Sequence, residues 1–437
     1  MKHTEFAQRR RELMEHMGDK SIAIVPTAPE QTRNRDVLYP YRPDSDFYYL
    51  TGFAEPEAVL VLIPGREHGE YILFCRDRNP DMEIWNGFRA GPDGARESWG
   101  ADDAFPVDDI DDILPGLLER TERVFYTMGN HPEFDRRLVG WMNRLRAQAR
   151  SGVHMPGEMV SLEHVLHDMR LIKSRAEIAA MRRAARISAE AHHRAMRACR
   201  PGLPEYALQS ELTAEFERHG GTHAYPPIVG GGANACVLHY IENRAELRDG
   251  DLVLIDAGGE FDYYAADITR TFPVNGRFTG PQRAVYEVVL ESQLQAIDAA
   301  RAGHHWNMPH EAAVRVLSQG LIDLGLLKGS LDEVIETEAY RRFFMHRTGH
   351  WLGMDVHDVG DYRIDDAWRL LEPGMVMTVE PGLYIRAADD VDPRFHDIGV
   401  RIEDDVVVTR DAPEVLTADA VKQIDEIEAL MASLETA

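Results

Sequence analysis

One short pattern occurs twice in the second half of this chain, and it constrains the fold more than any other feature. In LRDGDLVLID, Leu247 comes three positions before Gly250, and the apolar run ends at Asp256. LEPGMVMTVE repeats the pattern about 120 residues later and ends at Glu380. Each apolar run has the length of a strand, so the pattern twice delivers an acid to a strand end. The repeat predicts two related halves that face each other across one site.

A second acid follows each copy of the pattern on another strand-like run. Asp267 lies in YYAADITRTF, and Glu403 lies in GVRIEDDVVVT. The segment GGEFDYY between Asp256 and Asp267 is typical of a hairpin, which would place these two acids on neighbouring antiparallel strands. A single acid at a strand end is more often exposed or caps a turn, but acids that face each other need a cation between them. The two matched pairs therefore indicate a metal site.

The segment HRTGHWLGMDVHD between the two copies carries three histidines, His346, His350 and His357. Its two glycines and its valine favour a strand and loop over a helix. A single histidine is more often a surface or hydrogen-bonded core residue than a metal ligand. Beside four acids, however, His350 is interpreted as a ligand and His357 as a substrate-facing residue. Four carboxylates and one imidazole suit two divalent ions, Mn(II) first, with Co(II), Fe(II) or Zn(II) as alternatives.

Composition divides the chain into two parts. Residues 1–170 contain the short apolar runs SIAIVPT, AVLVLIPG and YILFC, which indicate an α/β domain. Residues 171–437 hold two rounds of helical segments followed by strands, and the first helix begins at a capping box of Ser174 and Glu177. The fold class is therefore α/β with two domains, the second carrying an internal pseudo-twofold duplication. The segment from Trp85, WNGFRAGPDGARESWGADD, is interpreted as irregular surface structure or a partner-contacting loop.

Net charge and hydropathy exclude some classes of function. The net charge of −26 would repel a phosphate backbone, which argues against nucleic acid as a partner. No apolar run approaches the roughly 18 residues of a membrane helix. The charged start MKHTEFAQRRRELMEHMG lacks the apolar core of a secretory signal, and three scattered cysteines are too few for a disulfide framework. We therefore expect a soluble, cytoplasmic protein that does not associate with membranes.

Five segments of the sequence resemble the aminopeptidase P family. This family belongs to metallopeptidase family M24 and to the creatinase and methionine aminopeptidase superfamily. YRPDSDFYYLTGF is similar to the amino-terminal domain of that family, and IDAGGEFDYYAADITRTFPVNG, HWLGMDVHDVG, TVEPGLYI and GVRIEDDVVVT are similar to its catalytic blocks. The resemblance covers nearly the whole chain. It implies a creatinase-like amino-terminal domain and a pita-bread catalytic domain. It further implies hydrolysis of peptides with proline at the second position by a homo-oligomer, either a dimer or a tetramer.

The resemblance also implies a set of metal ligands. Asp256 would bind one metal, Asp267 and Glu403 would bridge both, and His350 with Glu380 would complete the second. In the mechanism that follows, a metal-bridging hydroxide attacks the carbonyl of the Xaa-Pro bond. Glu380 would carry the proton from this nucleophile to the proline nitrogen as that nitrogen leaves.

Substrate-binding roles follow from the same resemblance. His239 and His357 are similar to histidines that contact the scissile peptide and stabilise its tetrahedral intermediate. His346 is similar to a histidine that lines the proline pocket. Arg401 is similar to the arginine that orients Asp256. The resemblance therefore implies that these side chains lie in one pocket with the metal ligands.

Two alternatives to this activity stay open. Prolidase shares the catalytic fold and ligands but cleaves only Xaa-Pro dipeptides, so it must recognise a terminal carboxylate. Arg363, Arg394 or Arg401 could serve that purpose. A non-catalytic pita-bread protein that binds peptides is the other alternative, although such proteins have usually lost ligands. Comparing a dipeptide with a tripeptide would test the first alternative, and metal content would test the second.

Overall fold

The chain passes from one structural unit to a second within a single helix, α7 (Glu163–Leu171). The computed structural model describes residues 2–433, and contacts between Cα atoms separate Met1–His167 from Asp168–Ala437. Both units combine helices with strands, which confirms the predicted α/β class with two domains. Among the described residues, no helix is long and apolar enough to span a bilayer.

A six-stranded mixed sheet forms the centre of the first unit, in the order β6-β5-β4-β1-β7-β8. Antiparallel pairing joins β1, β4 and β5, whereas the other three strands join in parallel. The core lies between this sheet and two helices, with Leu114, Leu138 and Trp141 buried against the strands. The strands and the two helices are β1 (Ser21–Pro26), β4 (Val59–Leu62), β5 (Tyr71–Cys75), β6 (Asp103–Pro106), β7 (Arg123–Phe125), β8 (Glu158–Val160), α5 (Ile110–Leu118) and α6 (Pro132–Ala147).

Two helices occupy most of the segment that the sequence predicts to be irregular. They are α3 (Pro80–Asn86) and α4 (Gly91–Trp99). Proline stands in the first turn of α4, where its missing amide hydrogen removes no bond. Gly100 ends the helix in the left-handed region, at a φ of 69°. The prediction was therefore wrong for α4, because a proline and a glycine that looked like loop residues mark the two ends of a helix.

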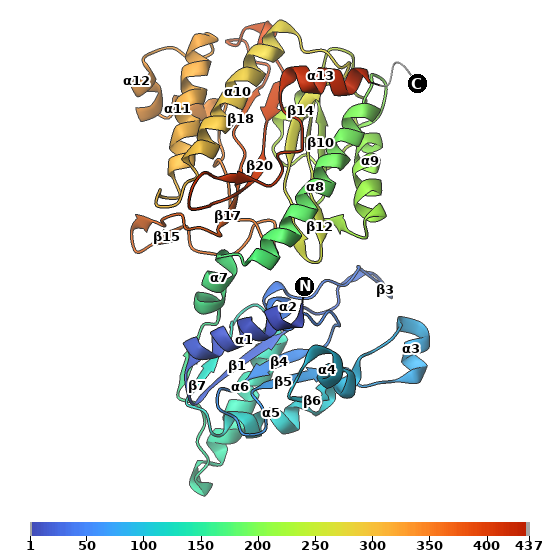
Figure 1. Ribbon diagram of the computed structural model, residues 1–437, viewed down its shortest axis with the longest axis vertical. Helices are drawn as coiled ribbons and strands as arrows, with labels where there is room; N and C mark the ends of the chain where they lie inside the picture. The colour runs from blue at the N-terminus through green and yellow to red at the C-terminus, as the bar shows by residue number, and fades with distance from the viewer. Residues whose placement is uncertain (1, 434–437) are drawn as a thin grey trace. The chain divides into compact units, whose positions relative to one another are not determined.

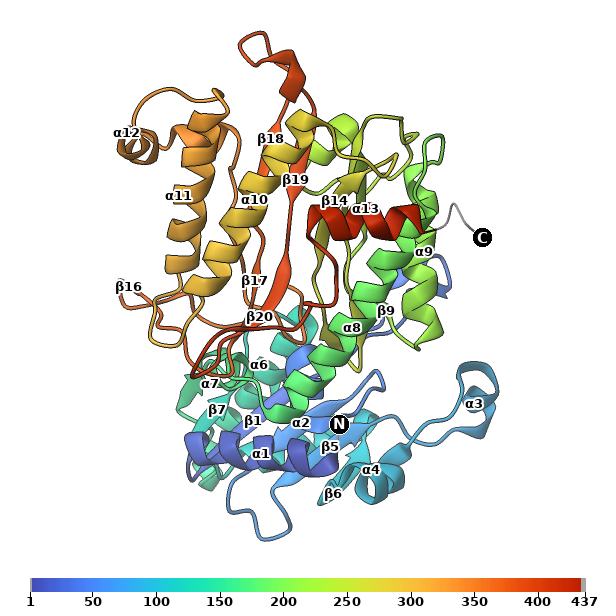
Figure 2. The same ribbon diagram turned by 45° about the horizontal axis from the view of Figure 1, so that its top comes forward.

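Two helix pairs flank the strands of the second unit, as Figures 1 and 2 both show. Each pair precedes its own set of strands in the chain, which is the order that the duplicated pattern predicts. Ser174 and Glu177 form the predicted capping box at the first pair, and Thr279 and Gln282 form an equivalent one at the second. The first pair is α8 (Arg175–Ala198) and α9 (Glu205–Arg218), and the second is α10 (Gly280–Ala299) and α11 (Met308–Asp323).

The two copies of the Leu-Gly-acid pattern enter their strands in the same way. Leu247 and Leu371 are both buried, and Gly250 and Gly374 both adopt positive φ, 85° and 99°. Only glycine adopts this conformation without strain. The strands that follow are β11 (Leu252–Asp256) and β17 (Val376–Val379), so each copy leads its acid to the same place in its half.

Antiparallel neighbours complete the strands of each half. In the first half, β11 lies between β10 (Ile228–Gly231) and β14 (Thr269–Pro273). In the second half, β17 pairs with β20 (Asp404–Val407), and β18 (Gly382–Ile385) pairs with β19 (Ile398–Arg401). Glu380 therefore lies between β17 and β18, and Glu403 lies between β19 and β20.

The predicted hairpin between Asp256 and Asp267 is present. It consists of β12 (Gly259–Phe261) and β13 (Tyr264–Ala265), and its two turn residues have positive φ, as a tight hairpin turn requires. The register of β11 and β14 pairs Asp256 with Thr269, which places Asp267 two residues before the neighbouring strand. The hairpin thus returns the second acid to the first.

Ten further helices and strands are present among the described residues. They are α1 (His3–Met17), β2 (Thr32–Asn34), β3 (Val37–Leu38), α2 (Ser45–Thr51), β9 (Thr222–His223), α12 (Leu331–Glu336), β15 (Arg363–Ile364), β16 (Ala367–Trp368), β21 (Glu414–Val415) and α13 (Ile424–Ala432).

Candidate metal centre

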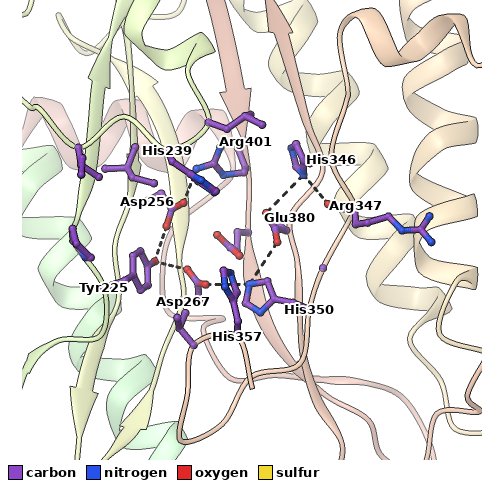
Figure 3. Close-up of a pocket in the computed structure, with 17 residues that line it drawn as sticks. Tyr225, His239, Asp256, Asp267, His346, Arg347, His350, His357, Glu380 and Arg401 are labelled. Carbon is purple, nitrogen blue, oxygen red and sulfur yellow. Dashed lines mark hydrogen bonds and ion pairs between the residues drawn. The ribbon is translucent and has the colours of Figure 1, made fainter. Parts of the chain in front are cut away.

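A pocket of about 460 Å³ opens in the second unit, and both halves of the duplication contribute to its lining. Every residue to which the sequence analysis gives a metal, catalytic or substrate-binding role lines this pocket (Figure 3). Arg363 and Arg394, by contrast, are not among the lining residues. The predicted site residues that the pocket brings together are His239, Asp256, Asp267, His346, His350, His357, Glu380, Arg401 and Glu403.

Carboxylates from the two halves meet at the floor of this pocket. Asp267 and Glu403 are 5% and 1% exposed. One ligand atom from each of Asp267, His350 and Glu403 lies within 4.8 Å of the other two. His350 Nε2 is 3.4 Å from Asp267 Oδ2 and 3.7 Å from Glu380 Oε1. These distances place an imidazole nitrogen and carboxylate oxygens around one point.

Backbone contacts within and between the halves fix these side chains. The amide nitrogen of Glu403 donates to Thr269 O at 3.1 Å, and that of Glu380 donates to Thr348 O at 2.8 Å. Gly349 lets the histidine loop lie against β17, because a Cβ at this position would meet Thr378 O at 2.1 Å. No helix forms around His350, as predicted, but the segment is a loop with a single bridge from Trp351 to Met377 and not the predicted strand.

Burial and crowding raise the pKa of most of these carboxyl groups. Burial raises the pKa of Asp267, and the charge of Asp256 raises it further. Burial raises the pKa of Glu380 to about 7. Burial and the charge of Asp267 hold the pKa of Glu403 well above its ordinary value. Such a cluster binds protons or a cation, so the donor set fits divalent metal ions.

His350 is oriented as a metal ligand. Its Nδ1 lies 2.9 Å from Trp351 O, which can only accept, so Nδ1 carries the hydrogen and Nε2 faces the carboxylates. Burial lowers the pKa of His350, but the hydrogen bond to Asp267 and the charge of Glu380 outweigh it and raise that pKa to about 9. Behind this loop, the Trp351 ring lies 4.1 Å from the Trp306 ring centroid and stacks on Tyr362 at 5.5 Å.

Arg401 connects the carboxylate of Asp256 to neighbouring buried side chains. It is buried, and its Nη2 donates to Asp256 Oδ2 at 2.6 Å. Its other nitrogens donate to Tyr384 Oη at 3.0 Å and to Thr269 Oγ1 at 3.1 Å. Thr269 in turn donates to Glu403 Oε2 at 2.6 Å. One guanidinium thus positions two carboxylates from different halves.

Tyr225 is a site residue that the sequence analysis did not identify. Its hydroxyl lies 2.6 Å from Asp256 Oδ1 and also hydrogen-bonds Asp267 (Figure 3). A hydroxyl has one hydrogen to donate, so it cannot satisfy two ionised carboxylates at once. This contact again calls for a proton or a cation between the acids. In HAYPPIVGG nothing separates Tyr225 from an ordinary core aromatic residue.

Burial keeps two further histidines of the pocket without charge. Burial and the charge of Arg401 lower the pKa of His346 to about 3, and its Nε2 lies 2.8 Å from Tyr384 Oη. Burial also lowers the pKa of His357, whose ring centroid lies 4.4 Å from that of His350. His346 donates its one ring hydrogen to Arg347 O at 2.7 Å, whereas a neutral His357 can donate a hydrogen bond to a carbonyl oxygen. The pocket also has apolar lining residues, which are Pro226, Ile228, Leu238, Ile241 and Val356.

Comparison with protein families assigns both units. Residues 179–410 match metallopeptidase family M24, and residues 6–126 match the aminopeptidase P N-terminal domain. The Xaa-Pro aminopeptidase of Escherichia coli is 49% identical over 429 residues, which are 98% of this chain and 97% of that protein. Xaa-Pro aminopeptidase 3 of Rattus norvegicus is 37% identical and is covered to 86%, again over 98% of this chain.

Solved structures agree with this assignment. Aminopeptidase PepP of Pseudomonas aeruginosa superposes with a TM-score of 0.99 at 59% identity, covering 100% of this chain and 99% of that one. A zinc-substituted Escherichia coli aminopeptidase P in complex with product superposes with a TM-score of 0.97 at 48% identity, covering 99% of both chains. The likeness therefore extends over both units.

Proposed function

Because the chain belongs to metallopeptidase family M24 and carries the aminopeptidase P N-terminal domain, we propose that it is an Xaa-Pro aminopeptidase. It would hydrolyse the bond between any amino-terminal residue and a penultimate proline. One observation carries the proposal. The full set of carboxylates and His350 lines one pocket, in a chain similar to an Xaa-Pro aminopeptidase over 98% of its length.

The pocket would hold two divalent ions, Mn(II) first. Asp256 would ligate one ion, His350 and Glu380 the other, and Asp267 and Glu403 both. The charges balance, since four carboxylates face two divalent ions. Such ions supply positive charge and make a water nucleophile available near neutral pH. The raised pKa values of Asp267, Glu380 and Glu403 in the metal-free protein support this arrangement.

Glu380 would carry the proton during hydrolysis. Its carboxylate accepts a proton from the attacking water and passes it to the proline nitrogen, which becomes the new amino terminus. Its position at the end of β17, with Oε1 3.7 Å from His350 Nε2, would place it beside the reacting groups. His239 and His357 would donate hydrogen bonds to the scissile carbonyl oxygen as negative charge develops there.

The same arrangement sets the direction of the substrate. The free amino terminus would lie at the Asp256 side, and the proline ring would lie against His346 and the apolar walls. Proline has no amide hydrogen, so this side of the pocket needs no acceptor for one and can select ring shape. The register would explain release of a single residue.

One experiment tests the proposal. The purified protein is treated with a chelator, reloaded with Mn(II), Co(II) or Zn(II), and assayed on an Xaa-Pro-Yaa tripeptide and the matching Xaa-Pro dipeptide. Metal-dependent cleavage of the tripeptide at the proline bond is expected. A protein that binds no metal and cleaves neither peptide would instead be a non-catalytic peptide-binding member of the family.

Prolidase activity is the second outcome that this assay can reveal. The positions of the three arginines considered for binding a dipeptide carboxylate do not support prolidase activity. Arg363 and Arg394 do not line the pocket, and Arg401 already pairs with Asp256. Exclusive cleavage of the dipeptide would nevertheless reject the aminopeptidase proposal.

We further propose that the protein is a cytoplasmic homo-oligomer, a dimer or a tetramer. Trp85 and Ile84 on α3 are 82% and 81% exposed, and Phe88 just after α3 is 68% exposed. Large apolar side chains that cluster on a surface are typical of a protein interface. The three cysteines are free and buried, which fits a reducing compartment.

A further inference from the structure

Arg347 lines the outer part of the pocket. It follows His346 directly in the chain and lies on the side away from Asp256, as Figure 3 shows. Its guanidinium carbon lies 5.1 Å from the centroid of the Trp368 ring. The guanidinium carbon of Arg363 lies 4.0 Å from the same centroid. Two cations thus share one aromatic ring beside the pocket.

Neither guanidinium has a partner that balances its charge. Within residues 2–433, no carboxylate pairs with Arg347 or Arg363, and neither donates a side-chain hydrogen bond. Other exposed arginines of this chain do pair, such as Arg394 with Asp392 at 2.8 Å.

The aromatic ring holds these cations in place. Arg363 and Trp368 face each other across the two-stranded pairing of β15 and β16, so the hairpin itself stacks one guanidinium on the ring. Attraction between a cation and an aromatic face restricts the arginine without using its hydrogen-bond donors. The planar donor groups therefore stay available for a carboxylate, which an arginine binds through two parallel bonds.

We propose that Arg347 and Arg363 bind a carboxylate on the substrate residue that follows proline. The inference rests on the proposed function, from which it takes the direction of the peptide. With the amino terminus toward Asp256 and proline against His346, the next residue extends toward Arg347. The carboxylate can be the chain end of a tripeptide or an acidic side chain at the third position of a longer peptide. The two arginines would thus determine specificity on the leaving-group side.

Two pairs of peptides test this inference on the metal-loaded protein. The first pair is Xaa-Pro-Ala with a free carboxyl end and the same tripeptide as its amide. The second is Xaa-Pro-Glu-amide and Xaa-Pro-Gln-amide. We expect kcat/KM to favour the carboxylate member of at least one pair about fivefold, through KM, and the preference to shrink at high salt. The pair that responds identifies the source of the carboxylate.

Variants connect the preference to the arginines. R347Q should bring the carboxylate-to-amide ratio of kcat/KM close to one, and R363Q should lower it in the same direction. R394Q removes another exposed arginine, which lies outside the pocket, and should keep the wild-type ratio. Unchanged melting temperatures would show that the variants fold.

Different results would overturn different claims. Equal kcat/KM within both peptide pairs would reject the inference and leave the proposed function standing. A preference that survives in R347Q and R363Q would also reject it, because other groups would then bind the carboxylate. Failure of the metal-loaded protein to cleave any of the four peptides would instead reject the proposed function.

Discussion

Glu380 has the position that a proton carrier needs. It lies at a strand end beside His350, and burial raises its pKa to about 7. E380Q keeps the shape of the side chain but cannot exchange the proton, so kcat should fall by about 10²- to 10⁴-fold. Steady-state kinetics measures the loss, and circular dichroism should stay unchanged.

A matched control separates this effect from a general one. E372Q makes the same substitution eight positions earlier, at a side chain that is 58% exposed. It should retain wild-type kcat. If E380Q also retained most of its activity, Glu380 would not carry the proton.

Asp267 should decide how much metal the protein holds. Its carboxylate contacts both His350 and Tyr225, and in our assignment it bridges both ions. D267N removes the charge and leaves the size unchanged, so elemental analysis should find at least one fewer ion per chain. D262N, on the exposed turn of the nearby hairpin, should bind as much metal as the wild type. Equal metal content in both variants would contradict the bridging assignment.

The site ligands were predictable from sequence because a duplicated pattern marks them. Asp256 and Glu380 each follow the glycine of the pattern by six positions, and Asp267 and Glu403 each lie on the next strand-like run. Tyr225 was not predictable, because its contact with two acids depends on how β10 packs beside β11. Arg347 was missed for a related reason, since its stacking on Trp368 joins segments that pair only in the folded protein. The ligand roles themselves stay predictions until metal is measured.

At the scale of elements, buried charges hold the loop that carries His357. Asp358 is almost completely buried, and Lys173 and Arg170 donate to its two oxygens at 2.8 and 2.6 Å. D358N leaves the buried Lys173 without a counter-charge and Arg170 with only the partly exposed Asp355, which should lower the free energy of unfolding by about 3–5 kcal/mol at pH 7. Because the loop positions His357, kcat should fall as well. Chemical denaturation and kinetics measure the two effects.

The difference in unfolding free energy between the wild type and D358N should depend on pH, because Asp358 pairs with two buried cations. Burial alone would raise the pKa of Asp358, but Lys173 and Arg170 outweigh it and lower that pKa below its ordinary value. A lowered pKa stabilises the fold above the ordinary value of about 4, and this stabilisation is lost as pH falls further. The wild type should therefore lose its greater free energy of unfolding, relative to D358N, below pH 4.

Asp355 provides the control for the loop. It also accepts from Arg170, at 2.8 Å, but its side chain is 37% exposed. D355N should therefore destabilise the protein by less than about 1 kcal/mol, as for a surface pair. Equal losses in D355N and D358N would show that burial of the pair is not what matters.

Local sequence signals predicted some elements better than others. The capping box at Ser174 and the hairpin turn after β12 depend on residues close in sequence, and both were predicted. The helix α4 was not, because glycine and proline mark loops and helix ends alike. Only the contacts on either side of Gly91–Trp99 distinguish the two.

At the scale of the whole molecule, metal should stabilise the second unit. Removing bound ions leaves several carboxyl groups buried together with raised pKa values. Binding to the folded state alone contributes about 2.7 kcal/mol when the metal concentration is 100 times its Kd. Differential scanning calorimetry should therefore show a lower Tm after chelation and recovery after reloading. A Tm that is the same before and after chelation would contradict a metal centre built from both halves.

Assembly should depend on the exposed apolar residues of α3. W85E places a charge at a side chain that is 82% exposed, and we expect it to shift the protein toward monomer in analytical ultracentrifugation. M128E changes another exposed apolar residue of the first unit, which is 56% exposed, and should leave the assembly unchanged. An oligomer that persists in W85E would place the interface elsewhere.

The internal duplication was the most predictable feature at this scale. Two helix pairs, two glycine turns and two terminal acids follow one another in the same order, so the order of residues alone revealed them. The number of bound ions and the assembly of chains were less predictable, because they depend on other molecules that bind the chain.

The aromatic stack behind His350 gives the protein a built-in optical signal. Trp351 follows a proposed ligand directly, and its ring packs against Trp306 and Tyr362. Indole emission responds to nearby charge and is quenched by ions with unpaired electrons, such as Mn(II) and Co(II), but much less by closed-shell Zn(II). Titrating the three ions while recording tryptophan emission would follow their loading without substrate, and W351F would show which ring reports it.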